Sequence, residues 1–244
     1  MKPMMPKISL RNVSVGYMSE TVIKGLSLDI QDGEITGICG PNGAGKTTLL
    51  CAVKGLARLV SGSVLIDGRE LNRRTGDWIR KGIGYVPQHF DIDPMLPVIS
   101  RDVMLMGSYG RLGVFRYPGR EEDMLMQGIA DMLEIGRIIE RPFGQLSGGE
   151  KKRILIARAL MQKPGIMLFD EIFSWLDSKS AEGFTRAIRD MHAVKNLTVL
   201  IVSHDMGILR ELCSRIISME NGRISDDTVN DTVLPELKDG HGIS

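Results

Sequence analysis

The stretch Gly40-Pro41-Asn42-Gly43-Ala44-Gly45-Lys46-Thr47 lies between two apolar segments, residues 34–39 before it and residues 48–56 after it. The first segment has the length and composition of a buried strand, and the second is typical of a helix that ends at Gly55. Glycines let the backbone curl, so that successive N–H groups and the positive end of the new helix face one anion. This order of strand, glycine-rich turn and helix is the setting in which G-x-x-x-x-G-K-T indicates a phosphate-binding P-loop.

The residues of this loop divide into a backbone cradle and two functional side chains. We expect the loop N–H groups to hold phosphate, the Lys46 ammonium to reach the outer phosphates, and the Thr47 hydroxyl to bind Mg²⁺. The alternative is a glycine-rich turn that carries a surface lysine. The predicted nucleotide-binding residues of this segment are Gly40, Asn42, Gly43, Ala44, Gly45, Lys46, Thr47 and Thr48.

The composition is that of a soluble globular protein, because 43% of the residues are hydrophobic and 25% are charged. A net charge of +1 without a long block of like charges gives no sign of a nucleic-acid surface or a polybasic membrane anchor. Cys39, Cys51 and Cys213 lie in apolar segments without metal-binding spacing, as is typical of reduced core residues in a cytoplasmic protein. The N-terminal residues lack the apolar run of a signal peptide, and no apolar stretch approaches 18 residues. If the protein works at a membrane, we therefore expect another chain to cross it.

Alternating strand and helix patterns predict an α/β core with an inserted block of helices. Residues 7–17 and 26–30 alternate apolar and polar side chains, as half-buried antiparallel strands do. Residues 165–169 and 198–202 are continuous apolar runs, which is typical of parallel strands covered on both faces. We also expect strands at 34–39, 63–67 and 84–87, and helices at 103–107 with Ser100 as N-cap, 121–133, 148–161 and 179–192.

These patterns predict one P-loop α/β domain over residues 1–226, with a mixed sheet, an antiparallel β subdomain and an inserted helical subdomain. The core is expected at about 1–88 and 164–226, and the helical subdomain at about 89–163. Residues 227–244, rich in Asp, Thr and Gly, are expected to form a frayed tail.

Three further segments carry candidate chemistry. Leu146-Ser147-Gly148-Gly149-Glu150 places an N-cap serine and two glycines before a long helix, which makes either a second anion site or an ordinary capped helix start. The strand at 165–169 is followed by Asp170 and Glu171, where one carboxylate can hold Mg²⁺ and the next can reach an attacking water. His204 follows the next strand at the same sheet edge. Acids or a histidine at a strand end are also common without such a role.

Taken together, these residues resemble the ATPase subunit of ATP-binding-cassette (ABC) transporters over nearly all of residues 7–226. The motifs that carry the resemblance occur in the family's order and spacing, and they are Gly40–Thr47, Gln88, Leu146–Glu150, Asp170-Glu171, Asp177 and His204. The resemblance implies that the chain binds ATP and Mg²⁺, with Thr47, Gln88 and Asp170 serving the metal ion or its waters. It further implies that Glu171 polarises the attacking water, that His204 contacts the γ-phosphate, and that Tyr17 stacks on the adenine.

The resemblance also implies protein partners. Ser147 and Gly149, with Gly148 between them, would touch the γ-phosphate of ATP held by a second copy of the chain, and Asp177 would lie in a loop that communicates between subunits. Two anion-binding helix starts on one domain cannot easily close on one nucleotide, whereas two head-to-tail domains make two complete sites. ATP would then hold the dimer together, and hydrolysis would loosen it. The other implied partners are integral-membrane permease subunits and, indirectly, an extracytoplasmic substrate-binding protein, which place the chain at the cytoplasmic face of the cell membrane.

A narrower resemblance concerns Pro97–Gly113, which is similar to the same region of bacterial ATPases that serve manganese, zinc or iron uptake. Family members use this surface to grip a helix of their membrane partner, so the resemblance implies a divalent transition metal as cargo. The alternative is a generic segment of the helical subdomain. Because the four histidines, His89, His192, His204 and His241, show no ligand spacing, the permease is expected to carry the metal.

Two departures from the family's pattern fall in one loop. Ile172 stands where the family usually has a proline after the catalytic glutamate, and Trp175 stands where it usually has glycine. An ATPase of translation or DNA maintenance is disfavoured, because the chain has one cassette. In addition, Ser147 follows Lys46 by only 101 positions, and the segment between them has no sustained heptads. An ABC-type ATPase for another cargo and a weakly hydrolysing ATP-binding interaction module remain open.

Overall fold

The computed structural model describes residues 5–17, 20–90, 93, 96–113, 116–174 and 176–230. The strands are β1 (Ile8–Tyr17), β2 (Glu20–Ile30), β3 (Ile35–Cys39), β4 (Leu59–Ile66), β5 (Arg69–Glu70), β6 (Ile83–Val86), β7 (Ile166–Asp170), β8 (Thr198–Val202), β9 (Arg215–Glu220) and β10 (Arg223–Val229). The helices are α1 (Lys46–Lys54), α2 (Gly76–Lys81), α3 (Ser100–Leu112), α4 (Arg120–Met132), α5 (Gly148–Leu160), α6 (Ser178–Lys195) and α7 (Met206–Leu212), with a 3₁₀ turn, η1, at Phe143–Gln145.

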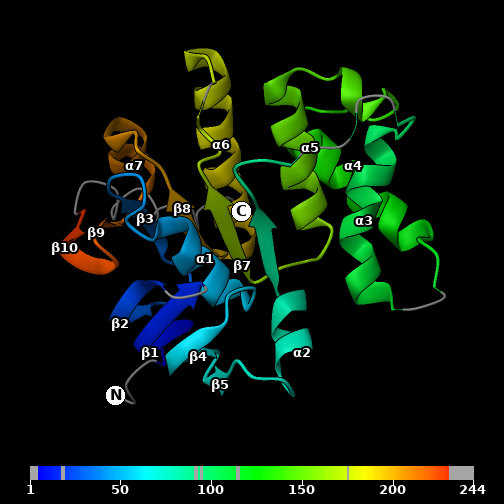
Figure 1. Ribbon diagram of the computed structural model, residues 1–244. Coiled ribbons are helices and arrows are strands. Elements are labelled where there is room, and N and C mark those ends of the chain that lie inside the picture. The colour runs from blue at the N-terminus through cyan, green and yellow to red at the C-terminus, as the bar shows by residue number, and fades with distance from the viewer. Residues whose placement is uncertain are drawn as a thin grey trace, which may run out of the picture.

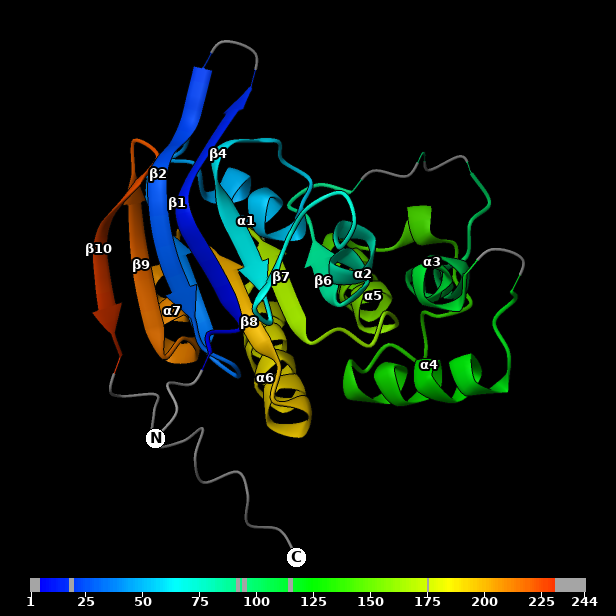
Figure 2. The ribbon, with the colours of Figure 1, turned by 90° about the horizontal axis from the view of Figure 1, so that it is seen from below.

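Two sheets enclose helix α1. A six-stranded mixed sheet has the order β10-β9-β3-β8-β7-β6, in which only β10 is antiparallel to its neighbour. A four-stranded antiparallel sheet has the order β2-β1-β4-β5 and lies on the other side of α1 (Figures 1 and 2). Leu49, Leu50 and Val53 of α1 are fully buried in the core between the sheets. The mixed sheet and the antiparallel β part confirm the predicted fold class.

Helices α6 and α7 cover the opposite face of the six-stranded sheet, where Phe184, Ile188 and Leu209 join a second buried core. Helices α3, α4 and α5 gather beside the β6 edge of this sheet, as Figure 1 shows. The same core continues into this helical block through Phe143 and Leu160. The inserted block of helices is therefore confirmed, whereas its division from the core at residues 88/89 and 163/164 stays a prediction.

The predicted helices and strands all have counterparts whose ends differ by a few residues, but Ser100 does not cap a helix. Ile99 occupies the N-cap position of α3 without a side-chain hydrogen bond, and Ser100 is its first residue. The buried Ser100 hydroxyl and backbone N–H instead both donate to the Arg141 carbonyl, at 2.9 and 3.0 Å. The serine ties the start of α3 to the segment before η1, so a tertiary contact replaces the predicted cap.

The last strand continues past residue 226, where a tail was expected to begin. Residues 226–229 pair antiparallel with residues 218–215 of β9. The Arg215 guanidinium also binds the Asp227 carboxylate with distances of 2.7 and 2.6 Å. Residues 227–229 therefore belong to the sheet, while residues 231–244 lie outside the described residues. Within the part that the structure describes, no helix has both the length and the apolar character needed to cross a bilayer.

A close approach of α3 to α5 makes one glycine of α3 sensitive to substitution. A Cβ atom at Gly107 would lie 1.8 Å from the Arg158 carbonyl oxygen, whereas a Cβ atom at Gly110 would meet nothing within 4 Å. Gly107→Ala should lower the free energy of unfolding by roughly 1–3 kcal/mol through overpacking. Gly110→Ala, the matched control, should raise it by up to about 1 kcal/mol because alanine favours the helix. Urea denaturation measures both, and equal effects would contradict this packing.

Candidate nucleotide-binding site

The carboxyl ends of four parallel strands place the candidate residues at one edge of the large sheet. Adjacent strands β3, β8, β7 and β6 are followed by the glycine-rich loop at Gly40, by His204, by Glu171 and by Gln88, respectively. In open α/β sheets, ligands bind outside the carboxyl ends of the strands. Segments that are far apart in sequence are thus brought together, as the strand pattern predicted.

A cavity of about 340 Å³ opens at this edge. It is lined by Val22, Asn42, Gly43, Gly45, Lys46, Thr47, Thr48, Gln88 and Glu171. All of these except Val22 were predicted from the sequence. Val22 belongs to β2 in the antiparallel sheet, and an alternating strand gives no signal that one of its side chains borders a cavity.

The glycine-rich loop adopts conformations that only glycine tolerates well. Gly40, Gly43 and Gly45 have φ angles of 139°, 79° and 100°, and a Cβ atom at Gly40 would lie 2.1 Å from the Met219 carbonyl oxygen. Helix α1 begins directly after Gly45 without a side-chain cap. The first N–H groups of a helix lack partners within the helix, so this end of α1 presents donors to an anion.

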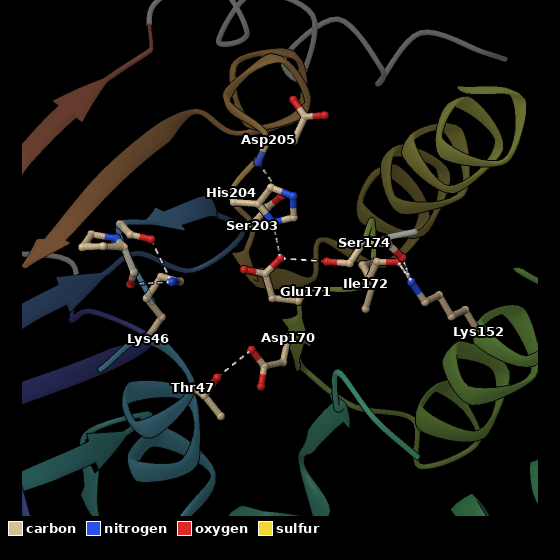
Figure 3. A network of polar contacts seen from close by, with 12 residues as sticks. Lys46, Thr47, Lys152, Asp170, Glu171, Ile172, Ser174, Ser203, His204 and Asp205 are labelled. Atoms are coloured by element: carbon tan, nitrogen blue, oxygen red, sulfur yellow. Dashed lines mark hydrogen bonds and ion pairs between the residues drawn. The ribbon is translucent and has the colours of Figure 1, made fainter. Parts of the chain in front are cut away.

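Two hydrogen-bonded groups lie behind the loop, one around Lys46 and the other around Asp170 (Figure 3). Lys46 is buried, and its ammonium donates to the carbonyls of Gly40 and Pro41 at 2.8 and 3.0 Å. The Thr47 hydroxyl donates to Asp170 Oδ1 at 3.0 Å, and the Tyr85 hydroxyl donates to Asp170 Oδ2 at 3.3 Å. Burial raises the pKa of the Asp170 carboxyl, and these two hydrogen bonds oppose the rise.

The predicted metal-binding residues supply the kind of ligand that Mg²⁺ prefers. The Thr47 hydroxyl and the Asp170 carboxylate are in direct contact, and Gln88 lines the same cavity. These side chains offer only oxygen ligands, apart from the amide nitrogen of Gln88, and Mg²⁺ binds few protein oxygens together with phosphate oxygens. The donor set therefore fits Mg²⁺. No cluster of three or more His, Cys, Asp or Glu side chains suited to a metal occurs among the described residues.

Glu171 stands at the cavity in a rare backbone conformation. Its φ angle is 52°, in the left-handed region, and its N–H donates to the Val202 carbonyl at 3.0 Å. One carboxylate oxygen, Oε2, accepts a hydrogen bond from the Ser174 hydroxyl and contacts His204 Nδ1, both at 2.9 Å (Figure 3). The Glu171 side chain is 10% exposed and the His204 side chain 70% exposed. The structure thus joins the two predicted catalytic residues in one contact.

Ser147 and the glycines beside it lie at the start of α5 and do not line the cavity. The Ser147 hydroxyl accepts from the Glu150 N–H at 3.3 Å, and Glu150 Oε2 accepts from the Ser147 N–H at 2.8 Å. This capping box confirms Ser147 as the N-cap of α5. Because Ser147 and Gly148 are exposed, their surface is open to a second molecule.

Two other predicted residues lie apart from the cavity lining. Asp177 is the N-cap of α6, and its carboxylate accepts from the N–H and the hydroxyl of Ser180 at 2.8 and 3.1 Å. Tyr17 is 50% exposed at the end of β1. Both residues are accessible on the surface, and neither belongs to the described residues that line this cavity.

The loop that follows Glu171 is held by a lysine that the sequence analysis missed. Ile172 is 1% exposed, so it packs in the core, whereas Trp175 lies outside the described residues. The Lys152 ammonium donates to the Ile172 carbonyl at 2.7 Å and also to the Ser174 carbonyl. Ser174 could have been suspected from its spacing of three residues from Glu171. Nothing in the sequence signals the contact of Lys152.

Comparison with known proteins agrees with this architecture. The sequence pattern of the ABC transporter family matches residues 23–174. The manganese transport system ATP-binding protein MntB of Listeria innocua serovar 6a is 31% identical over 229 residues, which cover 94% of this chain and 93% of that protein. The methionine import ATP-binding protein MetN of Clostridioides difficile is 33% identical over 242 residues, which cover 97% of this chain and 72% of that protein.

A solved structure shares the fold as well. The dimeric ATP-binding cassette MJ0796, in a post-hydrolysis state bound to ADP and Pi, superposes with a TM-score of 0.80 at 30% identity. The alignment covers 91% of this chain and 98% of that one. Fold and site therefore define a P-loop ATPase. The chain belongs to the ABC transporter family, as its ATP-hydrolysing subunit.

Substitution of Ser147 tests whether the capping box stabilises α5. Ser147→Ala removes the acceptor for the Glu150 N–H, and such N-cap losses cost about 1 kcal/mol. We expect the free energy of unfolding to fall by this amount in chemical denaturation. Gly148→Ala is the matched control, because its Cβ atom meets nothing within 4 Å and the cap stays intact. If the control loses as much stability as Ser147→Ala, the cap does not stabilise α5.

Proposed function

We propose that this subunit hydrolyses Mg²⁺-bound ATP at the edge formed by β3, β8, β7 and β6, and thereby drives a separate membrane permease for a divalent transition metal. The observation that carries the proposal is that Lys46, Thr47 and Glu171 line one cavity, with Asp170 hydrogen-bonded to Thr47. These groups supply a phosphate cradle, a metal site and a carboxylate that faces the same space. Such parts recur in phosphoryl-transfer enzymes, where catalysis depends on positioning and on charge stabilisation.

The glycine-rich loop and Lys46 are proposed to hold the phosphates. The Lys46 ammonium is bound to two loop carbonyls, so it is already positioned beside the N–H groups of α1. Thr47, Asp170 and Gln88 would hold Mg²⁺ or its waters, and Mg²⁺ when bound neutralises charge on the phosphate oxygens. Exposed Tyr17 would stack on the adenine, with Thr48 and Asn42 completing the binding surface.

Glu171 is the proposed group that orients and polarises the attacking water. Only Oε2 of its carboxylate has a protein partner among the described contacts, and the side chain borders the cavity that the phosphates would enter. His204 is proposed to contact the γ-phosphate, and its contact with the Glu171 carboxylate supports this role. A general base must lie within hydrogen-bond distance of the water proton that it removes, and a carboxylate at the edge of the cavity meets this requirement.

A second copy of the chain is proposed to complete each site. Ser147, Gly148 and Gly149 form a helix start outside the cavity lining, with an exposed surface at Ser147 and Gly148. A head-to-tail dimer would bring this helix start onto the γ-phosphate of ATP bound by the other copy, with Asp177 between the subunits. The dimeric state of the related cassette MJ0796 supports this arrangement.

Glu171→Gln should separate ATP binding from ATP hydrolysis. The change keeps the shape but removes the negative charge that polarises water, so the rate should fall by about 10²–10⁴-fold. The phosphate cradle is untouched, so ATP should still bind and hold two chains together. Steady-state ATPase assays and light scattering with ATP measure the two effects.

Lys46→Ala is the matched comparison, because it should weaken ATP binding itself and prevent the ATP-dependent dimer. A near wild-type rate for Glu171→Gln would show that Glu171 is not the base. Loss of ATP binding in Glu171→Gln would show that its carboxylate serves binding instead.

The proposed metal cargo rests on the Pro97–Gly113 segment and on the similarity to the manganese protein MntB. A cavity of about 400 Å³ beside this segment is bordered by residues of α3 and by charged residues of α2, and it is the proposed contact surface for a permease helix. MetN is equally similar, so another cargo is the alternative, as is a weakly hydrolysing binding module. In the preferred scheme the subunit sits at the cytoplasmic face of the membrane, and an extracytoplasmic substrate-binding protein delivers the metal to the permease.

Deletion of the gene tests the cargo directly. We expect cell-associated manganese, zinc or iron to fall, because the permease would lose its energy source. Complementation with the wild-type gene should restore the metal, and the gene carrying Lys46→Ala should not. Unchanged levels of all three metals, together with loss of an organic solute, would exclude a metal cargo.

A further inference from the structure

The side chain of Lys152 connects the helical block to the core. Lys152 lies on α5 in the helical block, and its ammonium reaches the loop that follows β7 in the core. It donates to the Ile172 carbonyl at 2.7 Å and to the Ser174 carbonyl, as Figure 3 shows. One cation thus fixes two carbonyls that are separated by a single residue, which is possible for only a narrow set of loop conformations.

The loop needs such a restraint because it begins with a strained residue. Glu171 has a φ angle of 52°, and a non-glycine residue keeps such a conformation only where its surroundings hold it there. On one side the Val202 carbonyl accepts the Glu171 N–H. On the other side the Ser174 N–H donates to the Glu171 carbonyl at 3.2 Å, within the turn that Lys152 binds.

The same turn aims the Glu171 side chain. The Ser174 hydroxyl donates to Glu171 Oε2 at 2.9 Å in a buried contact. Ser174 can make this bond only while its own backbone stays in place, and the Lys152 ammonium holds the Ser174 carbonyl. Lys152 therefore acts on the Glu171 carboxylate through two hydrogen bonds, one to the Ser174 carbonyl and one from the Ser174 hydroxyl.

We propose that Lys152 is a positioning residue for ATP hydrolysis, which holds Ser174 and, through it, the Glu171 carboxylate in the orientation that acts on water. The inference rests on the proposed role of Glu171. Lys152 also connects two proposed sites. Its helix, α5, follows Ser147, which is proposed to contact ATP on the second copy, and its ammonium holds the loop that orients Glu171. A shift of α5 toward that ATP would carry Lys152, and with it the loop that orients Glu171.

Lys152→Met tests the proposal, because methionine keeps an apolar chain of similar length and removes the donors. We expect kcat to fall roughly ten- to a hundredfold, as small misplacements of a catalytic group do, with an unchanged Kd for ATP in the absence of turnover. Lys152→Arg retains a cation and donors and should recover most of the loss. Lys151→Met is the matched control on the neighbouring residue, whose ammonium lies 5.9 Å from the Phe143 ring, and it should behave as wild type.

Double variants distinguish positioning from general destabilisation. In the Glu171→Gln background, Lys152→Met should cause no further loss of kcat, since the group it positions is already inactive. Lys152→Met with Ser174→Ala should cost less than the product of the two single effects for the same reason. The proposal is overturned if Lys152→Met has the same kcat as Lys151→Met. It is also overturned if Lys152→Met lowers kcat by the same factor in the Glu171→Gln background as in the wild type. If Glu171→Gln itself hydrolyses normally, the proposed function fails first, and the two failures are thereby distinguished.

Discussion

The register of three parallel strands is the constraint on which the site depends. Ile38 of β3 pairs with Val202 of β8, and Val202 pairs with Asp170 of β7. Because parallel strands keep a common direction, the residues that follow these three all leave the sheet at one edge. The glycine-rich loop, the histidine and the carboxylates therefore need no long side chains to meet. A slip of one residue in either pairing would turn Asp170 to the other face of the sheet and separate it from Thr47.

Contacts of the backbone at this edge account for the conformations of Gly40 and Glu171. Gly40 has a φ angle of 139°, and its Cα lies so near Met219 that a Cβ atom would overlap the carbonyl oxygen. Glu171 has a left-handed φ angle without being glycine, so its conformation depends on the hydrogen bonds to Val202 and Ser174 and on Lys152. Strain of this kind persists where neighbouring structure fixes it, and it places the carboxylate beside the cavity instead of within the sheet. The core supplies the rigidity, since β7 and β8 are buried along their whole lengths.

The sequence of a short segment was sufficient to predict those strands and turns whose conformation depends on neighbouring residues. The continuous apolar runs predicted β7 and β8, and the P-loop motif predicted the turn into α1, because burial on both faces and the need for glycine act on neighbouring residues. Parts that depend on distant contacts were missed or misjudged. Residues 227–229 at the end of β10 are exposed, so they were assigned to a tail, yet their backbone pairs with β9. Ser100 looks like a helix cap but bonds Arg141, and Lys152 reaches a loop 20 residues away in sequence.

The start of α5 shows how a structural cap and an anion site share one turn of helix. The Ser147 hydroxyl and the Glu150 carboxylate satisfy each other's N–H groups, so the donors that remain for a phosphate belong to Gly148 and Gly149. A carboxylate at this position would repel a phosphate. The hydrogen bond from the Ser147 N–H lowers the pKa of Glu150, so its carboxylate stays charged. Arg141 lies 3.1 Å from the other carboxylate oxygen and offsets that charge. Gly148 and Gly149 add no side chains of their own beside their N–H groups. In the proposed dimer, the serine would keep the helix start in shape and the glycines would contact the γ-phosphate.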